Sequence, residues 1–284
     1  MRKKTKKNLK VAVSEGVGFC SGVKRALKMA VDSAARSNSA VYSLGPLIHN
    51  PQVVERLKRK GIRPLSRLRN GGGTLVIRSH GISPKEVENA KLKGYKVIDA
   101  TCPFVRNAQE NARRIAQMGY RLVVIGERKH PEVKGILGHV DSRAVVVENQ
   151  KQAKALKFGQ RVGIIAQTTV PIDTFSSIVC EIARTAKEIL VINTICSETA
   201  RRQDKARALA ATVDAVLVVG GRNSANTSRL ATLCSSMCPK TYHIETAEEI
   251  LPRWFKAGAK VGVVAGASTP KWLVDNIVER LEEL

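Results

Sequence analysis

Long apolar runs, acidic residues and aromatic side chains are all scarce in this chain of 284 residues. No apolar run approaches the roughly 18 residues that a membrane-spanning helix needs, so no membrane anchor or membrane partner is expected. The first ten residues carry six lysines and arginines, but no apolar segment follows them, which excludes a secretory signal. Six cysteines without such a signal indicate reduced thiols or a metal site rather than a disulfide framework. We therefore expect a cytoplasmic protein.

The shortage of acidic residues gives the chain a formal net charge of +24. Such a balance attracts polyanions, including nucleic acids, anionic membranes and phosphorylated small molecules. The basic residues are scattered along solvated helix faces as well as gathered in an N-terminal arm, residues 1–10, which we expect to be disordered. Because of this scatter, nucleic acid is not expected to be the main partner, and a basic polyanion-binding or RNA-binding protein stays an alternative.

What the chain does contain is short Val/Ile/Leu runs alternating with longer helical patterns, which is typical of an α/β protein. The same pattern, a strand, a tight turn (here called a corner), a cysteine and a helix, occurs three times, with successive cysteines 82 and 94 residues apart. We therefore predict three α/β units, at residues 11–100, 101–194 and 195–281, after the arm. The cysteines at the three corners are Cys20, Cys102 and Cys196.

The middle corner shows why the cysteine matters. A β-branched run at residues 95–99 ends shortly before Cys102, Thr101 is the expected N-cap, and Pro103 suits the first turn of the next helix. Cys102 would then lie in the partly positive field of a helix N-terminus, where a thiol becomes a thiolate and can act as a nucleophile or metal ligand.

Two further strands in each unit lead into polar loops. The strands are predicted at 41–44, 74–78, 121–126, 162–166, 215–221 and 261–265. His49, His130 and Ser224 follow their cysteines by 29, 28 and 28 residues. Ligands bind at the carboxyl ends of parallel strands, and similarity at a fixed period predicts a repeated architecture. The fold class is therefore α/β, with three pseudo-threefold-related units of mainly parallel sheets around a common centre.

The third unit ends in a helix at 271–281, whereas the first two end in strands at 95–99 and 189–193 that lead into the next cysteine. We therefore expect the strand at 11–14, which precedes Cys20, to complete the third sheet.

Three thiolates from separate corners can hold a metal centre. Their spacing matches neither the local pairs of zinc sites nor the clustered run of bacterial ferredoxins. It fits a [4Fe-4S] cluster with one iron that has no protein ligand and can act as a Lewis acid. Histidines, hydroxyls and amides in the polar loops suit a phosphorylated substrate. Glu132 is a candidate proton donor among them.

These loops carry a resemblance to the family of the 4-hydroxy-3-methylbut-2-enyl diphosphate reductases, over about residues 10 to 281. Eight motifs in order support it: GFCSGV at 18–23, LIHNP at 47–51, SHG at 79–81, ATCP at 100–103, HPEV at 130–133, QTT at 167–169, NSAN at 223–226 and GAS at 266–268.

The resemblance implies Cys20, Cys102 and Cys196 as ligands of the [4Fe-4S] cluster. It implies a diphosphate site made of His49, His80, Ser224, Asn226 and Ser268, with His130 beside it and the backbone N–H group of Ala225 available. It further implies that Thr168 and Glu132 bind the substrate hydroxyl and relay its proton. The expected reaction is a reductive dehydroxylation, which yields isopentenyl and dimethylallyl diphosphate in the non-mevalonate isoprenoid pathway. Reduced ferredoxin or flavodoxin is the implied electron donor.

The chain departs from the family pattern at three positions. Ala225 stands where many relatives have a second serine, and Asn107 and Gln109 stand where a lysine and a histidine are common. We expect Asn107 and Gln109 to support the site from behind or to lie on the surface.

Three cysteines stay outside the repeat. Cys180 is predicted in the core face of a helix, and Cys234 and Cys238 are predicted to be structural. A cluster-dependent dehydratase without net reduction is a further alternative function.

Overall fold

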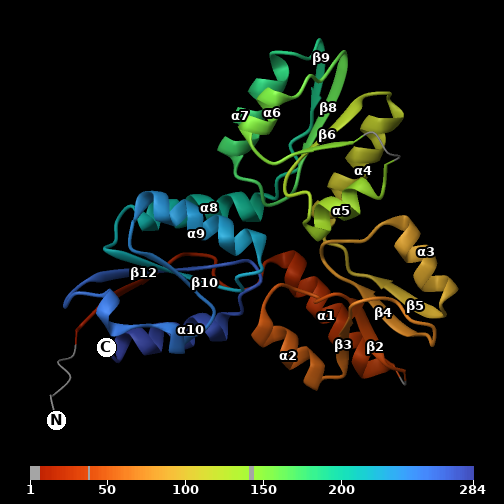
Figure 1. Ribbon diagram of the computed structural model, residues 1–284. Helices are drawn as coiled ribbons and strands as arrows, with labels where there is room; N and C mark the ends of the chain where they lie inside the picture. The colour runs from red at the N-terminus through yellow and green to blue at the C-terminus, as the bar shows by residue number, and fades with distance from the viewer. Residues whose placement is uncertain (1–6, 38, 141–143) are drawn as a thin grey trace. The chain divides into compact units, whose positions relative to one another are not determined.

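The structure is a computed structural model that describes residues 7–37, 39–140 and 144–284 (Figure 1). Most of the predicted basic arm, residues 1–6, lies outside the described residues. No described helix is both long and apolar enough to span a membrane.

Twelve strands are described. They are β1 (Lys10–Val13), β2 (Val41–Leu44), β3 (Ile62–Leu65), β4 (Gly73–Ile77), β5 (Tyr95–Asp99), β6 (Arg121–Ile125), β7 (Val145–Val147), β8 (Arg161–Ala166), β9 (Glu188–Val191), β10 (Ala215–Val219), β11 (Thr241–Ile244) and β12 (Lys260–Ala265). Every strand predicted above is present to within two residues at either end.

Helices follow most of these strands along the chain. They are α1 (Ser21–Arg36), α2 (Pro51–Arg59), α3 (Pro84–Leu92), α4 (Pro103–Gln117), α5 (Pro131–Leu137), α6 (Gln150–Ala155), α7 (Ile172–Ala183), α8 (Ser197–Ala210), α9 (Ala225–Met237) and α10 (Lys271–Glu282), with short 3₁₀ helices η1 (Ala247–Glu249) and η2 (Pro252–Trp254).

The strands form three parallel sheets of four strands each. Sheet 1 has the order β3-β2-β4-β5, sheet 2 the order β7-β6-β8-β9, and sheet 3 the order β11-β10-β12-β1. All nine strand pairs are parallel. The three orders are equivalent, and in each the strand that precedes a cysteine lies at one edge. The predicted α/β class with three parallel-sheet units is confirmed.

The strand before the first cysteine does complete the third sheet. β1 pairs with β12, with Val11 opposite Val261 and Val13 opposite Val263. The prediction for residues 11–14 is therefore confirmed, although these residues are far from sheet 3 in sequence.

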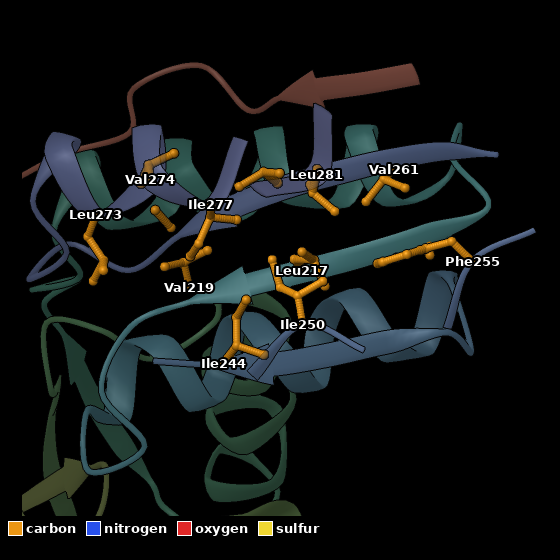
Figure 2. Close-up of a cluster of buried hydrophobic side chains, with 13 residues drawn as sticks. Leu217, Val219, Ile244, Ile250, Phe255, Val261, Leu273, Val274, Ile277 and Leu281 are labelled. Carbon is orange, nitrogen blue, oxygen red and sulfur yellow. The ribbon is translucent and has the colours of Figure 1, made fainter. Parts of the chain in front are cut away.

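The core of sheet 3 follows from the alternation of side chains along a strand. Leu217 and Val219 of β10 pack in one cluster with Leu273 and Ile277 of α10, as Figure 2 shows. On the opposite face, the neighbouring valines of β10 pack against α8 and α9. Figure 1 shows α10 on one side of β10 and β12 and the helices α8 and α9 on the other.

Sheet 2 is covered in the same way. Ile164 packs with Ile178 of α7, whereas Ile165 belongs to the cluster that α4 and α5 form with the sheet. At Gly163 a Cβ atom would lie 2.2 Å from Cγ2 of Ile115, so α4 approaches β8 as closely as glycine permits.

The prediction for Cys180 was wrong. The buried face of α7 is formed by Phe175, Ile178, Glu181 and Ile182, and Cys180 lies on the other face and is exposed. The other two cysteines outside the repeat, Cys234 and Cys238, are buried in the core beneath α9, in agreement with a structural role.

The chain divides into two compact units. The first, here called the sheet-3 unit, contains the chain up to Ser21, His49–Val53 and Glu198–Leu284. The second, the two-sheet unit, contains Gly22–Ile48 and Val54–Ser197, and therefore sheets 1 and 2.

Candidate active site

Each candidate cysteine lies between the edge strand of a sheet and the helix that follows. Cys20 lies between β1 and α1, Cys102 between β5 and α4, and Cys196 between β9 and α8. None is in a disulfide, and each is partly exposed. The structure therefore presents three thiols at equivalent places in three equivalent sheets.

Cys102 itself is the N-cap residue of α4, so the expectation that Thr101 would cap this helix was wrong. The N–H group of Thr101 donates to Oδ1 of Asp99 at 2.8 Å, which holds Thr101 in a turn and lets the helix begin one residue later. Cys102 consequently lies directly at the N-terminus of α4.

One backbone hydrogen bond recurs at all three cysteines. The N–H group of Cys20 donates to Ala267 at 3.1 Å, that of Cys102 to Ser79 at 3.0 Å, and that of Cys196 to Thr168 at 2.9 Å. The accepting carbonyls belong to the loops after β12, β4 and β8, the strands next to the edge strands. The backbone of each cysteine is thereby fixed to a loop that carries a predicted substrate residue.

The surroundings of the thiols fit a metal cluster. Gly22, in the first turn of α1, leaves the space that the thiol of Cys102 occupies, because a Cβ atom there would lie 2.6 Å from its Sγ. Nη1 of Arg25 donates to the carbonyl of Thr101 at 3.0 Å, and Nη2 of Arg202 donates to the carbonyl of Gly18 at 2.8 Å. These guanidinium groups add positive charge near two of the cysteine loops, and thiolates are the ligands that iron–sulfur clusters use.

The predicted substrate residues follow the two central strands of each sheet. In a sheet of this order the chain turns in opposite directions on either side of those strands, and the switch point between them is the usual ligand site. The loops after β2 and β4 lead to His49 and His80, those after β6 and β8 to His130 and Thr168, and those after β10 and β12 to Ser224 and Ser268.

In the sheet-3 unit, Ser224, Ala225 and Asn226 form the N-terminus of α9, and the loops of Ser268 and His49 are hydrogen-bonded to each other. Ser224 caps this helix and accepts a hydrogen bond from Thr227 at 3.4 Å. Oγ of Ser268 donates to the carbonyl of His49 at 3.3 Å. Asn226 is only 8% exposed, and neither its amide nitrogen nor its amide oxygen has a hydrogen-bond partner among the described residues. A buried, unpaired amide at a helix N-terminus is suited to bind an anion.

In the two-sheet unit, Glu132 and Thr168 make a buried pair. Oε1 of Glu132 accepts from the backbone N–H of Thr168 at 2.6 Å, and Oε2 accepts from its hydroxyl at 2.9 Å. Glu132 is 2% exposed, so both hydrogen bonds are shielded from solvent.

His130 connects this pair to sheet 1. It caps α5, and its Nδ1 accepts a hydrogen bond from the N–H of Glu132 at 3.1 Å. The neutral ring therefore carries its proton on Nε2 and can donate from that side. The rings of His80 and His130 meet edge to face, with their centroids 5.4 Å apart.

The contacts of the two-sheet unit form one unbroken series between two cysteines. From Cys102 it passes through the loop of His80 to His130, then to Glu132 and Thr168, and finally to Cys196. The sheet-3 unit brings together Cys20, His49, Ser224, Ala225, Asn226 and Ser268.

Positive charge also accompanies the loop of His80. Arg78 immediately precedes this loop, its Nε is buried, and burial lowers the pKa of its guanidinium, an effect that the charge of Glu86 opposes. Its Nη1 fills the space beside Gly45, which has φ +72°. The sequence reasoning did not single out Arg78.

Two residues of α4 depart from the family pattern and were expected either to lie on the surface or to support the site from behind. Asn107 is exposed on the surface, whereas Gln109 is buried, with 5% of its surface exposed. The signal was present in the sequence, because position 109 belongs to the same helical stripe as the buried Val105, Ala108 and Ala112.

Fold and site together define a class of parallel α/β proteins with a thiol at the edge strand of each sheet and polar side chains at each switch point. The sequence profile of the family described as LytB protein matches residues 11–282, and the chain belongs to that family.

Similar proteins agree with this assignment. The chain is 48% identical over 277 residues to the 4-hydroxy-3-methylbut-2-enyl diphosphate reductase of Geobacter metallireducens, covering 97% of this chain and 98% of that protein. The reductase of Aquifex aeolicus with the same name is 46% identical over 279 residues, with 96% of both chains covered.

Two solved structures are also similar. One is of (E)-4-hydroxy-3-methyl-but-2-enyl diphosphate reductase, described as the terminal enzyme of the non-mevalonate pathway, with 44% identity, a TM-score of 0.69, and 97% of this chain and 100% of that chain covered. The other is the E-1-hydroxy-2-methyl-but-2-enyl-4-diphosphate reductase of Plasmodium falciparum, with 26% identity, a TM-score of 0.89, and coverage of 96% and 87%. These comparisons give no support to the alternative of a polyanion-binding protein.

Proposed function

We propose that the protein is an iron–sulfur reductase that converts 4-hydroxy-3-methylbut-2-enyl diphosphate into isopentenyl and dimethylallyl diphosphate. The observation that carries this proposal is the series of contacts in which the buried Glu132–Thr168 pair stands between Cys102 and Cys196. This series of contacts places a candidate proton donor, Glu132, between two cysteines whose thiols could hold a redox cofactor.

Cys20, Cys102 and Cys196 are the proposed ligands of a [4Fe-4S] cluster. When bound, the cluster would supply two electrons, one at a time, together with an iron that has no protein ligand and acts as a Lewis acid. The recurring N–H bonds and the glycine beside Cys102 support this assignment, because the bonds fix the backbone of each cysteine and the glycine leaves room for the thiol of Cys102.

The diphosphate of the substrate is bound by donors from the switch-point loops. Asn226 offers its unpaired amide, the N-terminus of α9 offers backbone N–H groups that include that of Ala225, and Ser224 and Ser268 offer hydroxyls. The further donors are the imidazole rings of His49, His80 and His130. These groups are suited to a phosphate because they donate without requiring a buried permanent charge.

Glu132 and Thr168 act on the C4 hydroxyl. The hydroxyl of Thr168 binds the substrate oxygen, and the carboxyl group of Glu132 gives it the proton with which it leaves as water. The resulting carboxylate is stabilised by the two donors of Thr168 that already face it. A second proton then reaches one end or the other of the allylic group, so two electrons and two protons yield one water and either product.

The electron donor is a small acidic redox protein of the ferredoxin or flavodoxin class, and the protein acts in the cytoplasm. The net charge of +24 supports an acidic donor, because opposite charges accelerate encounter.

Turnover by anaerobically purified protein tests the function. The protein should be brown, contain about four irons per chain, and consume two electrons for each substrate converted when a reduced viologen dye is the donor. Conversion without electron consumption would identify the dehydratase instead. Colourless protein after anaerobic reconstitution, with tight salt-sensitive RNA binding that Cys20→Ser leaves intact, would support the polyanion-binding alternative.

A further inference from the structure

Gln109 is a polar side chain within the apolar face of α4. Its neighbours on that face are Val105, Ala108 and Ala112, and it is 5% exposed. Its Nε2 is buried and makes no hydrogen bond to any described residue. Since a buried N–H group without an acceptor is unfavourable, its presence here calls for a function.

The amide group lies between two glycines. A Cβ atom at Gly81, which has φ +70°, would lie 2.5 Å from Nε2 of Gln109, and one at Gly135 would lie 3.4 Å from the same nitrogen. The latter Cβ would also lie 3.5 Å from the carbonyl oxygen of His80. Nε2 and this carbonyl therefore border the same small space.

The two glycines belong to the parts of the two-sheet unit that carry the substrate residues. Gly81 follows His80 in its loop, and Gly135 lies in α5, the helix that begins after His130 and contains Glu132. Gln109 itself lies two turns into the helix that Cys102 caps. One side chain thus abuts both the loop of His80 and the helix of His130.

We propose that Gln109 is a positioning residue of the diphosphate site, whose Nε2–H group donates to the carbonyl oxygen of His80 when the anion binds. An anion that accepts from the rings of both His80 and His130 draws their loop and helix together, which closes the space that the amide borders. The bond then holds the loop at residues 79–82 against α5. This inference rests on the proposed function, because it assumes that His80 and His130 bind the substrate diphosphate.

The test uses anaerobically prepared holoenzyme with inorganic pyrophosphate as the probe. Gln109→Met keeps the length and volume of the side chain but removes its donor, and Gln109→Leu does the same with a second shape. Gln109→His restores a ring N–H, and Gln117→Leu, at an exposed position of the same helix, is the matched control. Because an apolar side chain replaces an amide whose buried nitrogen is unpaired, the variants should keep the fold.

Calorimetry should show that Gln109→Met and Gln109→Leu bind pyrophosphate roughly two- to tenfold more weakly than the unchanged protein, the factor that one hydrogen bond gives. Hydrogen exchange supplies a readout that a loss of packing alone would not produce. Pyrophosphate should slow amide exchange at residues 79–82 in the unchanged protein and in Gln109→His, but not in Gln109→Met.

Unchanged affinity and unchanged exchange protection in both apolar variants would overturn the inference while leaving the proposed function intact. An equal loss in Gln117→Leu would also overturn it. Holoenzyme that neither binds pyrophosphate nor reduces the substrate would overturn the proposed function and the inference with it.

Discussion

Gly22→Ala is the substitution that addresses the cofactor site most directly. The glycine lies two residues after Cys20, and an added Cβ atom would lie 2.6 Å from Sγ and 3.2 Å from Cβ of Cys102. Nothing else about the position opposes alanine, because the residue is helical and has no positive φ.

The magnitude follows from these distances. Non-bonded heavy atoms come to rest about 3.5 Å apart or more, so the thiol of Cys102 must move by about 1 Å. Metal–ligand distances tolerate only about 0.2 Å, so the displacement is several times what a cluster can accommodate. Alanine meanwhile favours a helix by up to about 1 kcal/mol over glycine. The variant should therefore fold at least as well as the unchanged protein but bind much less iron.

Iron and sulfide per chain, measured after anaerobic reconstitution, check this expectation, and thermal melting of the metal-free protein checks the fold. Lys24→Ala, at an exposed position of the same helix, is the control and should retain its iron. A Gly22→Ala protein with the full iron content would refute the reasoning, because Cys102 could then not be a ligand held in this place.

Three other expectations concern single sites. Glu132→Gln should lower turnover by roughly 10²–10⁴-fold while iron content and substrate affinity persist, since the amide can still pair with Thr168 but cannot give up a proton; near-normal turnover would remove Glu132 from the mechanism. Burial, with a smaller contribution from the neighbouring Cys238, raises the pKa of Cys234 to about 12, so the folded protein keeps a proton that the unfolded chain loses above about pH 9. Stability should fall as the pH rises from about 9 to 12, and urea titrations should show a shallower fall for Cys234→Ala. Gly163→Ala should cost roughly 1–3 kcal/mol in the free energy of unfolding by overpacking, and a smaller penalty in an Ile115→Ala background would identify the clash.

The strands that the sequence predicted most directly are those that can be recognised from the residues of the segment alone. β4, β8 and β12 are apolar runs buried on both faces, and such runs identify central parallel strands without any knowledge of the fold. The repeat then placed the polar loops, because equivalent strands must present equivalent ends. This is why the candidate residues could be named before the sheets were known.

The strands that the sequence did not predict are those at the edge of each sheet opposite the cysteine. β3, β7 and β11 have only three or four residues, and β3 contains Pro64, which is compatible with an edge position but weakens any strand pattern. Their pairing with β2, β6 and β10 is decided by the tertiary structure. The contacts of Gln109 with the two glycines could not be predicted for a related reason, since a helical stripe indicates which face is buried but not which loops it meets.

The recurring backbone N–H bond explains why, in every sheet, the cysteine lies next to a loop that carries a proposed substrate residue. Neighbouring strands lie about 4.8 Å apart, so the end of the edge strand and the loop of the strand beside it are already within reach of a hydrogen bond. Each cysteine at the edge is partly exposed, and its N–H group donates to the carbonyl of Ser79, Thr168 or Ala267 in the neighbouring loop. His80 and Ser268 follow two of these carbonyls directly, and Thr168 supplies the third itself. A shift of any one cysteine must therefore move a proposed substrate residue with it, which ties the geometry of the cofactor to that of the substrate through the backbone of each sheet.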